Sequence, residues 1–132
     1  MSADPYRHNA EWYAALARPG LPAVREALAV LLPGVIPTGV VVEVGAGIGA
    51  TLDSFLDAGA ERIFAVEPSP EMRVGLMTRI GLDERLAPIT TVLPGTLDEM
   101  SGRLPARWGA LVLLNVLGHL TEVEETRMWH LV

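Results

Sequence analysis

The sequence has no cysteine and no lysine, and its ten basic residues are all arginine. The absence of cysteine excludes disulfides and thiolate metal ligands, and it fits a cytoplasmic protein. The absence of lysine excludes a Schiff-base mechanism and a P-loop lysine. No apolar run approaches the roughly 20 residues of a membrane-spanning helix, and the N-terminal MSADPYRHNAEWY lacks the basic-then-apolar order of a secretion signal. We therefore expect no membrane partner and no thiol chemistry.

Positive charge is also scarce, because the 10 basic residues face 16 acidic ones and the formal net charge is -6. Proteins that bind phosphate backbones are normally basic, so nucleic acid is not an expected partner. The histidines and carboxylates lack the spacing of metal ligands, so we expect no metal site. What the chain does contain is a composition that is 50% hydrophobic and 20% charged over 132 residues, which indicates one globular domain.

Apolar segments of strand length alternate with segments of helical periodicity along the second part of the chain. The expected strands cover residues 40–44, 62–66, 89–93 and 110–116. The expected helices cover residues 9–18, 22–32, 48–58 and 70–80, followed by a short helical turn at 96–100 and a last helix from 121. Pro19-Gly20 is expected to separate the first two helices. The fourth helix is expected to begin after a Ser69 N-cap, with Pro70 at its first position, and to be capped at its end by Gly81. The alternation predicts an α/β fold, a Rossmann-like three-layer sandwich with a mostly parallel sheet.

The fourth expected strand, ALVLLNV, is the most continuously apolar of the four, which predicts an interior position in the sheet. No later strand follows it, and the sequence ends within the last expected helix. Because an exposed apolar edge favours aggregation, we expect a sheet truncated after the fourth strand. Either a missing C-terminal segment or self-association would then complete the sheet. The alternative is an edge strand that the last helix covers.

The stretch VVEVGAGIGATL joins the first expected strand to a helix through a glycine-rich turn, residues 45–50. Glycine permits positive φ and a close approach of a ligand to the backbone. Gly45, Gly47 and Ala50 match the dinucleotide pattern G-x-G-x-x-G/A, whereas Gly45, Gly47 and Gly49 match the G-x-G-x-G of S-adenosylmethionine sites. The turn alone leaves both ligands open, and also a tight turn that binds no ligand.

Two glutamates lie near the turn, and one of them, Glu43, favours the adenosyl ligand. Glu43 lies two residues before the first glycine, in an otherwise apolar strand, and a buried carboxylate needs a partner. Beside a pyrophosphate it would repel like charge, whereas it would attract the ammonium group of a methionine moiety. Glu67 ends the next expected strand and is placed to accept both ribose hydroxyls, which suits either cofactor.

Three segments, VVEVGAGIGATL, AVEPSPEM and WGALVLLNVLGHL, in this order and at these distances, resemble class I S-adenosylmethionine-dependent methyltransferases. The resemblance covers about residues 40–125. It implies a cofactor-binding domain at 40–132, preceded by N-terminal helices at 1–39 that act as a lid or entry segment. The segment YRHNAEWY is similar to the tyrosine-rich entry helix of members that act on small molecules.

The resemblance also implies individual roles. Glu43 would hold the amino group of the cofactor, and Glu67 its ribose hydroxyls. Thr96 stands where the family often has an aspartate that binds the adenine amino group, which implies a weaker or different polar contact. The full set of residues implied to contact the cofactor is Glu43, Gly45, Ala46, Gly47, Gly49, Glu67, Pro68, Ser69, Met72, Thr96, Leu97 and Asn115.

The implied activity is methyl transfer from S-adenosylmethionine to a small-molecule acceptor, with S-adenosylhomocysteine as product. A general base is optional, and the candidates are His119 and Tyr13. The simpler interpretation of His119 is a loop residue bonded to a backbone carbonyl, and of Tyr13 and Trp12 the core packing of an N-terminal helix. Two other functions stay open: an NAD-binding oxidoreductase domain, and a methyltransferase-like module without activity that serves in binding or assembly.

Overall fold

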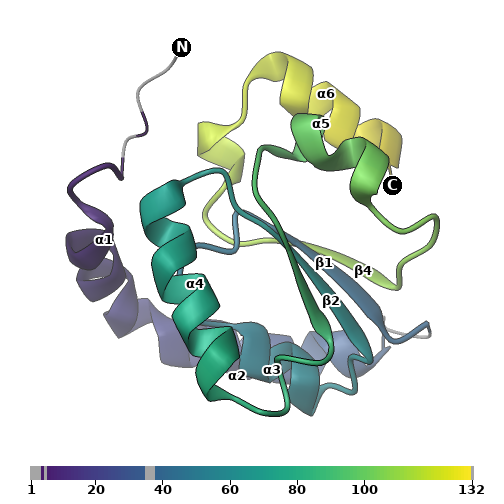
Figure 1. Ribbon diagram of the computed structural model, residues 1–132. Helices are drawn as coiled ribbons and strands as arrows, with labels where there is room; N and C mark the ends of the chain where they lie inside the picture. The colour runs from purple at the N-terminus through teal and green to yellow at the C-terminus, as the bar shows by residue number, and fades with distance from the viewer. Residues whose placement is uncertain (1–3, 5, 35–37, 132) are drawn as a thin grey trace.

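The structure, a computed structural model, describes residues 4, 6–34 and 38–131. Its centre is a sheet of four parallel strands in the order β3-β2-β1-β4 (Figure 1). The strands are β1 (Val40–Val44), β2 (Arg62–Val66), β3 (Thr90–Leu93) and β4 (Ala110–Leu113). The chain runs outward from β1 to β3 and then returns to the opposite side of β1 as β4. The strand order therefore reverses between β1 and β4, where open α/β sheets bind their ligands.

Helices cover both faces of the sheet (Figure 1). One face packs against α2 (Leu21–Leu31), α3 (Leu52–Asp57) and α4 (Pro70–Leu82), and the other against α5 (Leu97–Met100) and α6 (Glu122–Leu131). The remaining helical elements are α1 (Ala10–Ala17) and the 3-10 turns η1 (Arg18–Gly20), η2 (Leu32–Gly34), η3 (Ser101–Arg103) and η4 (Leu117–His119). The expected three-layer α/β architecture with a parallel sheet is confirmed. None of the described helices is long and apolar enough to cross a bilayer.

The alternation of side chains along each strand builds two apolar cores. Val41 and Ile63 point to the face that Phe55 of α3 and Leu76 of α4 cover, and all four are fully buried. The opposite face holds a second cluster, formed by Val42, Val44, Phe64, Val66, Leu93, Leu97 and Met128. A strand that is buried on both faces must be apolar throughout, which explains why β1 departs from the apolar pattern only at Glu43.

Several element boundaries differ from the sequence expectations, and the backbone explains the main ones. α3 begins at Leu52, well after residue 48, because Gly47 and Gly49 have φ of 58° and 75°, outside the helical region. β4 ends at Leu113, well before residue 116, and Asn115 at φ 57° then turns the chain away from the strand direction.

Two glycine predictions are wrong in detail. Gly81 does not cap α4, because the helix continues to Leu82 and Asp83 is the extended capping residue. Pro19-Gly20 does not break the N-terminal helices apart, since both residues lie in the 3-10 turn that leads directly into α2. The expected connector at 32–39 begins as η2, and its residues 35–37 lie outside the described part of the chain.

β4 pairs with β1 and with no second strand among the described residues, so it forms an edge of the sheet. Its residues Leu111 and Leu113 pack into the cluster that contains Met128 of α6. The last helix thus covers one face of this edge strand, as the alternative interpretation expected, while the outer backbone edge of β4 has no strand partner in the part described.

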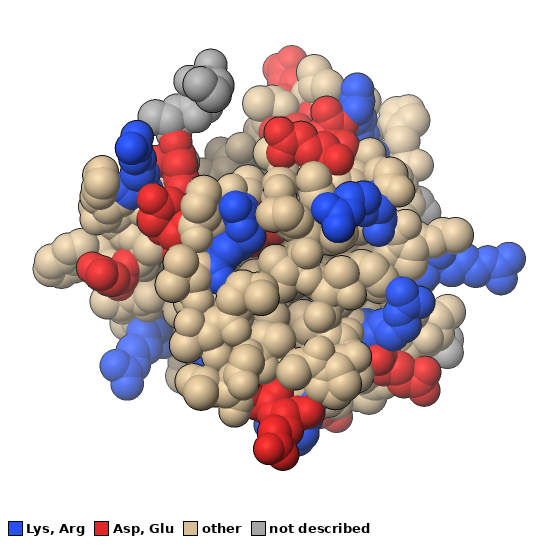
Figure 2. Space-filling model, in the orientation of Figure 1, with Lys and Arg blue, Asp and Glu red and all other residues tan. Residues whose placement is uncertain are grey.

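The face that carries α4 is largely uncharged (Figure 2). Val74, Met77 and Leu82 are exposed there, and arginine and acidic side chains alternate around them. This face shows no continuous basic surface of the kind that binds a phosphate backbone.

Candidate functional site

The candidate site lies where β1 and β4 end, around the glycine turn. The N–H groups of Gly45 and Ala46 both donate to the Val66 carbonyl, at 2.8 and 3.0 Å, so the turn continues the pairing of β1 with β2 before it bends away. Gly45, Gly47 and Gly49 all have positive φ, between 58° and 75°. A side chain at any of the three would strain the backbone, which accounts for the glycine at each.

The three glycines differ in what surrounds them. A Cβ at Gly45 would lie 2.4 Å from Cγ2 of Val116, so this glycine lets the segment after β4 approach the turn. A Cβ at Gly49 would lie 2.8 Å from Cδ1 of Leu76, so this glycine packs against α4. A Cβ at Gly47 would meet no atom within 4 Å. Of the three, Gly47 is the one whose missing side chain leaves open space for a ligand.

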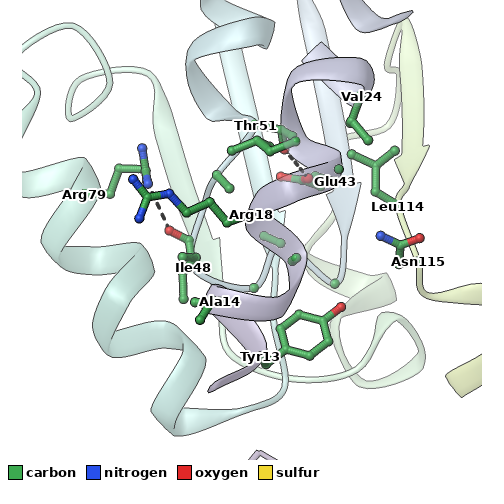
Figure 3. A pocket seen from close by; sticks show the side chains of 18 residues that line it. Tyr13, Ala14, Arg18, Val24, Glu43, Ile48, Thr51, Arg79, Leu114 and Asn115 are labelled. Carbon is green, nitrogen blue, oxygen red and sulfur yellow. Dashed lines mark hydrogen bonds between the residues drawn. The ribbon is translucent and has the colours of Figure 1, made fainter. Parts of the chain in front are cut away.

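A wide cavity of about 460 Å³ lies on one side of the turn (Figure 3). α1 and η1 contribute Tyr13 and Arg18 to its wall, and α4 contributes Arg79. Its floor includes Glu43, Ala46 and Ile48. No residue of α1 is buried, so this helix lies along the cavity rather than in the core.

A narrow cavity of about 140 Å³ lies on the other side of the turn. Most of the residues implied to lie at the ribose and the adenine of a cofactor line it, namely Glu67, Pro68, Met72, Thr96 and Leu97. Tyr13, Gly45, Gly47, Leu114 and Asn115 line both cavities. The two cavities therefore meet at the glycine turn, and a single extended ligand can reach into both.

Glu43 is the most unusual side chain of the wide cavity. It is 2% exposed, its Oε1 accepts a 2.7 Å hydrogen bond from the Thr51 hydroxyl, and its Oε2 is buried with no partner among the described residues. Burial raises the pKa of Glu43 to about 8, against the opposing effect of the Thr51 hydrogen bond, and the nearby Glu67 raises it further. A buried carboxylate oxygen without a partner is costly, so this group is suited to receive a cationic ligand.

Glu67 ties the two loops of the site together. Its Oε2 accepts from the Gly47 N–H at 2.7 Å, and its Oε1 accepts from the Ser69 N–H at 2.8 Å. Burial raises the pKa of this carboxyl group, whereas the two backbone N–H groups and Arg73 act in the opposite direction. Each carboxylate oxygen has a second lone pair, so Glu67 retains the capacity to accept hydrogen bonds from a ligand.

The N-terminus of α4 and that of α5 border the narrow cavity. The Ser69 hydroxyl caps α4 by accepting from the Met72 N–H at 3.3 Å, as the sequence predicted. Thr96 caps α5 in a reciprocal arrangement with Glu99, at 2.8 and 3.2 Å. The Thr96 N–H and hydroxyl oxygen are therefore engaged in the cap, and the weaker contact of Thr96 with a ligand stays a prediction.

The cap at Ser69 should contribute to the free energy of unfolding. Replacing Ser69 by alanine should lower the free energy of unfolding by about 1 kcal/mol, because the cap on Met72 and the bond from its hydroxyl to Asp4, 2.8 Å long, are both lost. Urea unfolding measures the change. Ser101→Ala, which removes only an exposed bond to the Asp98 carbonyl, is the matched control and should shift the value by less than about 0.5 kcal/mol. Equal effects of the two variants would contradict the assignment of the cap.

Both candidate bases lie at the cavities. Tyr13 is half-buried and lines both cavities, so it does not pack into the core. Trp12 is 69% exposed, so the interpretation of Trp12 as a core residue is wrong. His119 is exposed, lines the narrow cavity, and has no side-chain hydrogen bond among the described residues. Tyr6 joins them, with its ring 5.0 Å from that of Tyr13 and 6.4 Å from that of His119.

The residues predicted to contact the cofactor differ in whether they line a cavity. Ser69 and Gly49 line neither cavity and support the site from beneath, while the other predicted contacts line one or both. The sequence did not single out Thr51, Arg18 or Arg79. Thr51 carried a usable signal, since a hydroxyl at the start of the helix that follows the glycine turn lies close to the end of β1. The two arginines carried none, because only the positions of η1 and α4 beside the turn bring them to the same cavity.

Metal chemistry finds no support in the part of the chain that the structure describes. No group of three or more histidine, aspartate or glutamate side chains lies close enough there to hold a metal ion.

Asn115 is exposed and lines both cavities. Among the described residues, it is the one residue other than glycine that has a positive φ. Backbone conformations of this kind concentrate at functional sites.

No family model matches the sequence, and no curated protein matches it. Solved structures do. The glycopeptide N-methyltransferase MtfA complexed with (S)-adenosyl-L-methionine is 22% identical over 82% of this chain and 42% of its own, with a TM-score of 0.66. MtfA complexed with sinefungin is 20% identical over 98% of this chain and 44% of its own, with a TM-score of 0.60. Protein arginine methyltransferase 10 of Arabidopsis thaliana is 24% identical over 65% of this chain and 24% of its own, with a TM-score of 0.55.

These similarities concern the fold. The chain spans less than half the length of each of these proteins. Within that span, the chain shares the fold of these solved methyltransferases, with a parallel sheet that helices cover on both faces. The expected fold is confirmed: the chain has the fold of class I S-adenosylmethionine-dependent methyltransferases.

Proposed function

We propose that the two cavities together bind S-adenosylmethionine and that the chain serves in methyl transfer to a small-molecule acceptor. The single observation that carries this proposal is the pair of buried glutamates on opposite sides of one glycine turn. Glu67 lies at the narrow cavity with spare acceptor capacity, and Glu43 lies at the wide cavity with an unpartnered oxygen.

The residues present fit the cofactor. Glu43 would hold the ammonium group, which supplies the partner that its Oε2 lacks. Glu67 would accept the ribose hydroxyls, with Pro68 and Met72 beside the adenine. Gly47 leaves space between the two halves of the site. Solved neighbours of this fold were crystallised with S-adenosylmethionine and sinefungin, which supports the choice of ligand.

When bound, the cofactor supplies an electrophilic methyl group on a sulfonium. The chain would contribute orientation and exclusion of water. Tyr13 and His119 line the cavities at which the acceptor would enter, and either is placed to receive a proton from an acceptor that must lose one. The N-terminal helices would act as a lid, because Asp4 accepts a hydrogen bond from the Ser69 hydroxyl and Tyr6 and Tyr13 line the narrow cavity.

A dinucleotide fits the site less well. Glu43 is buried at the glycine turn, where the pyrophosphate of NAD would have to lie, and a pyrophosphate there would supply no cation for this carboxyl group and would further disfavour its ionised form. A module that binds the adenosyl ligand without catalysis is compatible with the same site. The chain spans only 42–44% of MtfA. Cofactor binding and methyl transfer therefore need separate measurements.

Isothermal titration calorimetry tests the proposal. S-adenosylmethionine and S-adenosylhomocysteine should each bind with one site per chain, and NAD should give no heat of binding at the same concentrations. Binding of NAD without binding of the adenosyl ligands would overturn the assignment. Transfer of a radiolabelled methyl group to a panel of small acceptors then separates an active enzyme from a binding module.

A further inference from the structure

The narrow cavity has an inner wall and an outer rim that differ in burial. The inner wall is apolar and almost fully buried, and it is formed by Val44, Val66, Met72 and Leu97. The rim is open to solvent and polar, and it consists of the half-buried Tyr6, Tyr13 and Glu124 and the exposed Asn115 and His119. A cofactor whose adenosine lies against the inner wall can therefore leave the rim to a second molecule.

The rim reaches the junction of the two cavities. Tyr13 and Asn115 line both cavities, as do Gly45 and Gly47 of the turn. With the adenosine on one side of the turn and the amino-acid end on the other, the methyl group of the cofactor would lie at this junction. Figure 3 shows the Tyr13 hydroxyl directed toward Asn115. An acceptor bound at the rim would therefore be next to the carbon atom that it attacks.

The aromatic groups of the rim form a corner. The rings of Tyr6 and Tyr13 have centroids 5.0 Å apart and planes at 69°, and the His119 ring lies 6.4 Å from that of Tyr6. Burial raises the pKa of Tyr6, and the nearby Tyr13 and Glu67 raise it further, so this phenol stays uncharged. The face of an uncharged aromatic ring attracts a cation.

The formal charges around the narrow cavity are negative, with histidine counted as neutral. Among the described residues that line it, Glu67 and Glu124 are acidic and none is an arginine. The Oε2 of Glu124 accepts from the Thr121 N–H and hydroxyl at 2.8 and 3.0 Å, and its Oε1 has no described partner. Carboxylates and aromatic faces without a guanidinium group favour a cationic ligand over one that carries a carboxylate or a phosphate.

We propose that the rim binds the ammonium group of an amine acceptor, with Tyr6 and Tyr13 as aromatic faces and Glu124 as counter-ion. The inference rests on the proposed function and narrows its small-molecule acceptor to an amine. His119 is exposed beside Tyr6 and can take a proton from the bound ammonium. The nitrogen then uses its freed lone pair to bond the methyl carbon, and the electron pair of the broken carbon–sulfur bond stays on the sulfur as a neutral thioether.

Nuclear magnetic resonance titrations of protein saturated with S-adenosylhomocysteine test this assignment. The probes are benzylammonium, benzyl alcohol and benzoate, which share one ring and differ in the charge of the head group. The variants are Tyr6→Leu, Tyr6→Phe, which keeps the aromatic face, and Glu124→Gln, which keeps an acceptor for Thr121 and tests the site even where Tyr6→Leu does not fold. The matched control is Glu122→Gln, which removes an exposed carboxylate of the same helix that lines neither cavity.

The wild type should bind benzylammonium about tenfold more tightly than benzyl alcohol, with the largest amide shifts at residues 115–124, and should not bind benzoate there. Tyr6→Leu and Glu124→Gln should each weaken the binding of benzylammonium about threefold or more. Tyr6→Phe and Glu122→Gln should leave it unchanged.

Equal binding of the amine and the alcohol, preferred binding of benzoate, or equal losses in Glu124→Gln and Glu122→Gln would overturn the cation site in a protein that binds S-adenosylhomocysteine. The proposed function fails on a separate result, when the wild type does not bind S-adenosylhomocysteine. The same titrations of the ligand-free protein then still show whether the rim prefers a cation.

Discussion

Replacing Glu67 by alanine should weaken the binding of S-adenosylhomocysteine by about 10- to 100-fold. The Glu67 carboxylate would accept hydrogen bonds from the ribose hydroxyls, and the loss of a charge-assisted hydrogen bond corresponds to roughly 1.5–3 kcal/mol. The same change removes the acceptors of the Gly47 and Ser69 N–H groups, so the turn itself also loses support. Calorimetry of the folded variant gives the affinity, and circular dichroism confirms that it is folded.

A matched ligand separates the two causes. The wild type should bind S-adenosylhomocysteine more tightly than its 2′,3′-dideoxy analogue, whereas Glu67→Ala should bind both alike. The control Glu84→Ala removes an exposed carboxylate far from either cavity and should leave both affinities unchanged. A folded Glu67→Ala protein that still prefers the ribose hydroxyls would show that Glu67 does not contact them.

The affinity for S-adenosylhomocysteine should rise with pH and level off above about pH 8. Burial holds the Glu43 pKa at about 8 in the free protein, so the carboxyl group is protonated at neutral pH. An ammonium group placed beside Oε2 favours the ionised form and lowers this pKa in the complex. Binding below pH 8 therefore releases a proton, and the affinity should increase by up to tenfold per pH unit, or about 100-fold between pH 6 and pH 8.

Calorimetry in buffers of different ionisation enthalpy counts the released proton directly. Glu43→Gln keeps the shape and the acceptor for Thr51, and its binding should be weaker at pH 8 and independent of pH. The variant also has a second readout. Between about pH 4.5 and about pH 8 the folded state keeps the Glu43 proton, whereas the unfolded state loses it. The free energy of unfolding of the wild type therefore falls as the pH rises through this range, by about 3 kcal/mol up to neutral pH. Glu43→Gln should abolish that fall. A pH-independent affinity of the wild type would contradict the role of Glu43.

The sequence predicted the parts of the site that local chemistry determines. The apolar run of β1, the glycines after it and the Ser69-Pro70 cap each require a specific backbone, so the strand, the turn and the start of α4 are found where expected. The two glutamates were identifiable because a charge in an apolar strand, or at its end, needs a reason.

What the sequence did not predict depends on packing between distant segments. Arg18 and Arg79 lie 61 positions apart in numbering and line one cavity only because η1 and α4 both approach the glycine turn. The approach of Val116 to Gly45, and with it the division of the site into two cavities, likewise depends on how the segment after β4 folds back. The early end of β4 follows from the positive φ of Asn115, a conformation that no local pattern required.

The most direct test of the account is a crystal structure of the protein with S-adenosylhomocysteine. The central claim is that the two cavities are halves of one site, joined at Gly45 and Gly47. The predicted result is a ligand whose adenosine lies in the narrow cavity, with its ribose hydroxyls on Glu67, and whose amino group contacts Oε2 of Glu43 in the wide cavity. A ligand bound outside these cavities, or one that leaves Oε2 of Glu43 without a partner, would contradict the account.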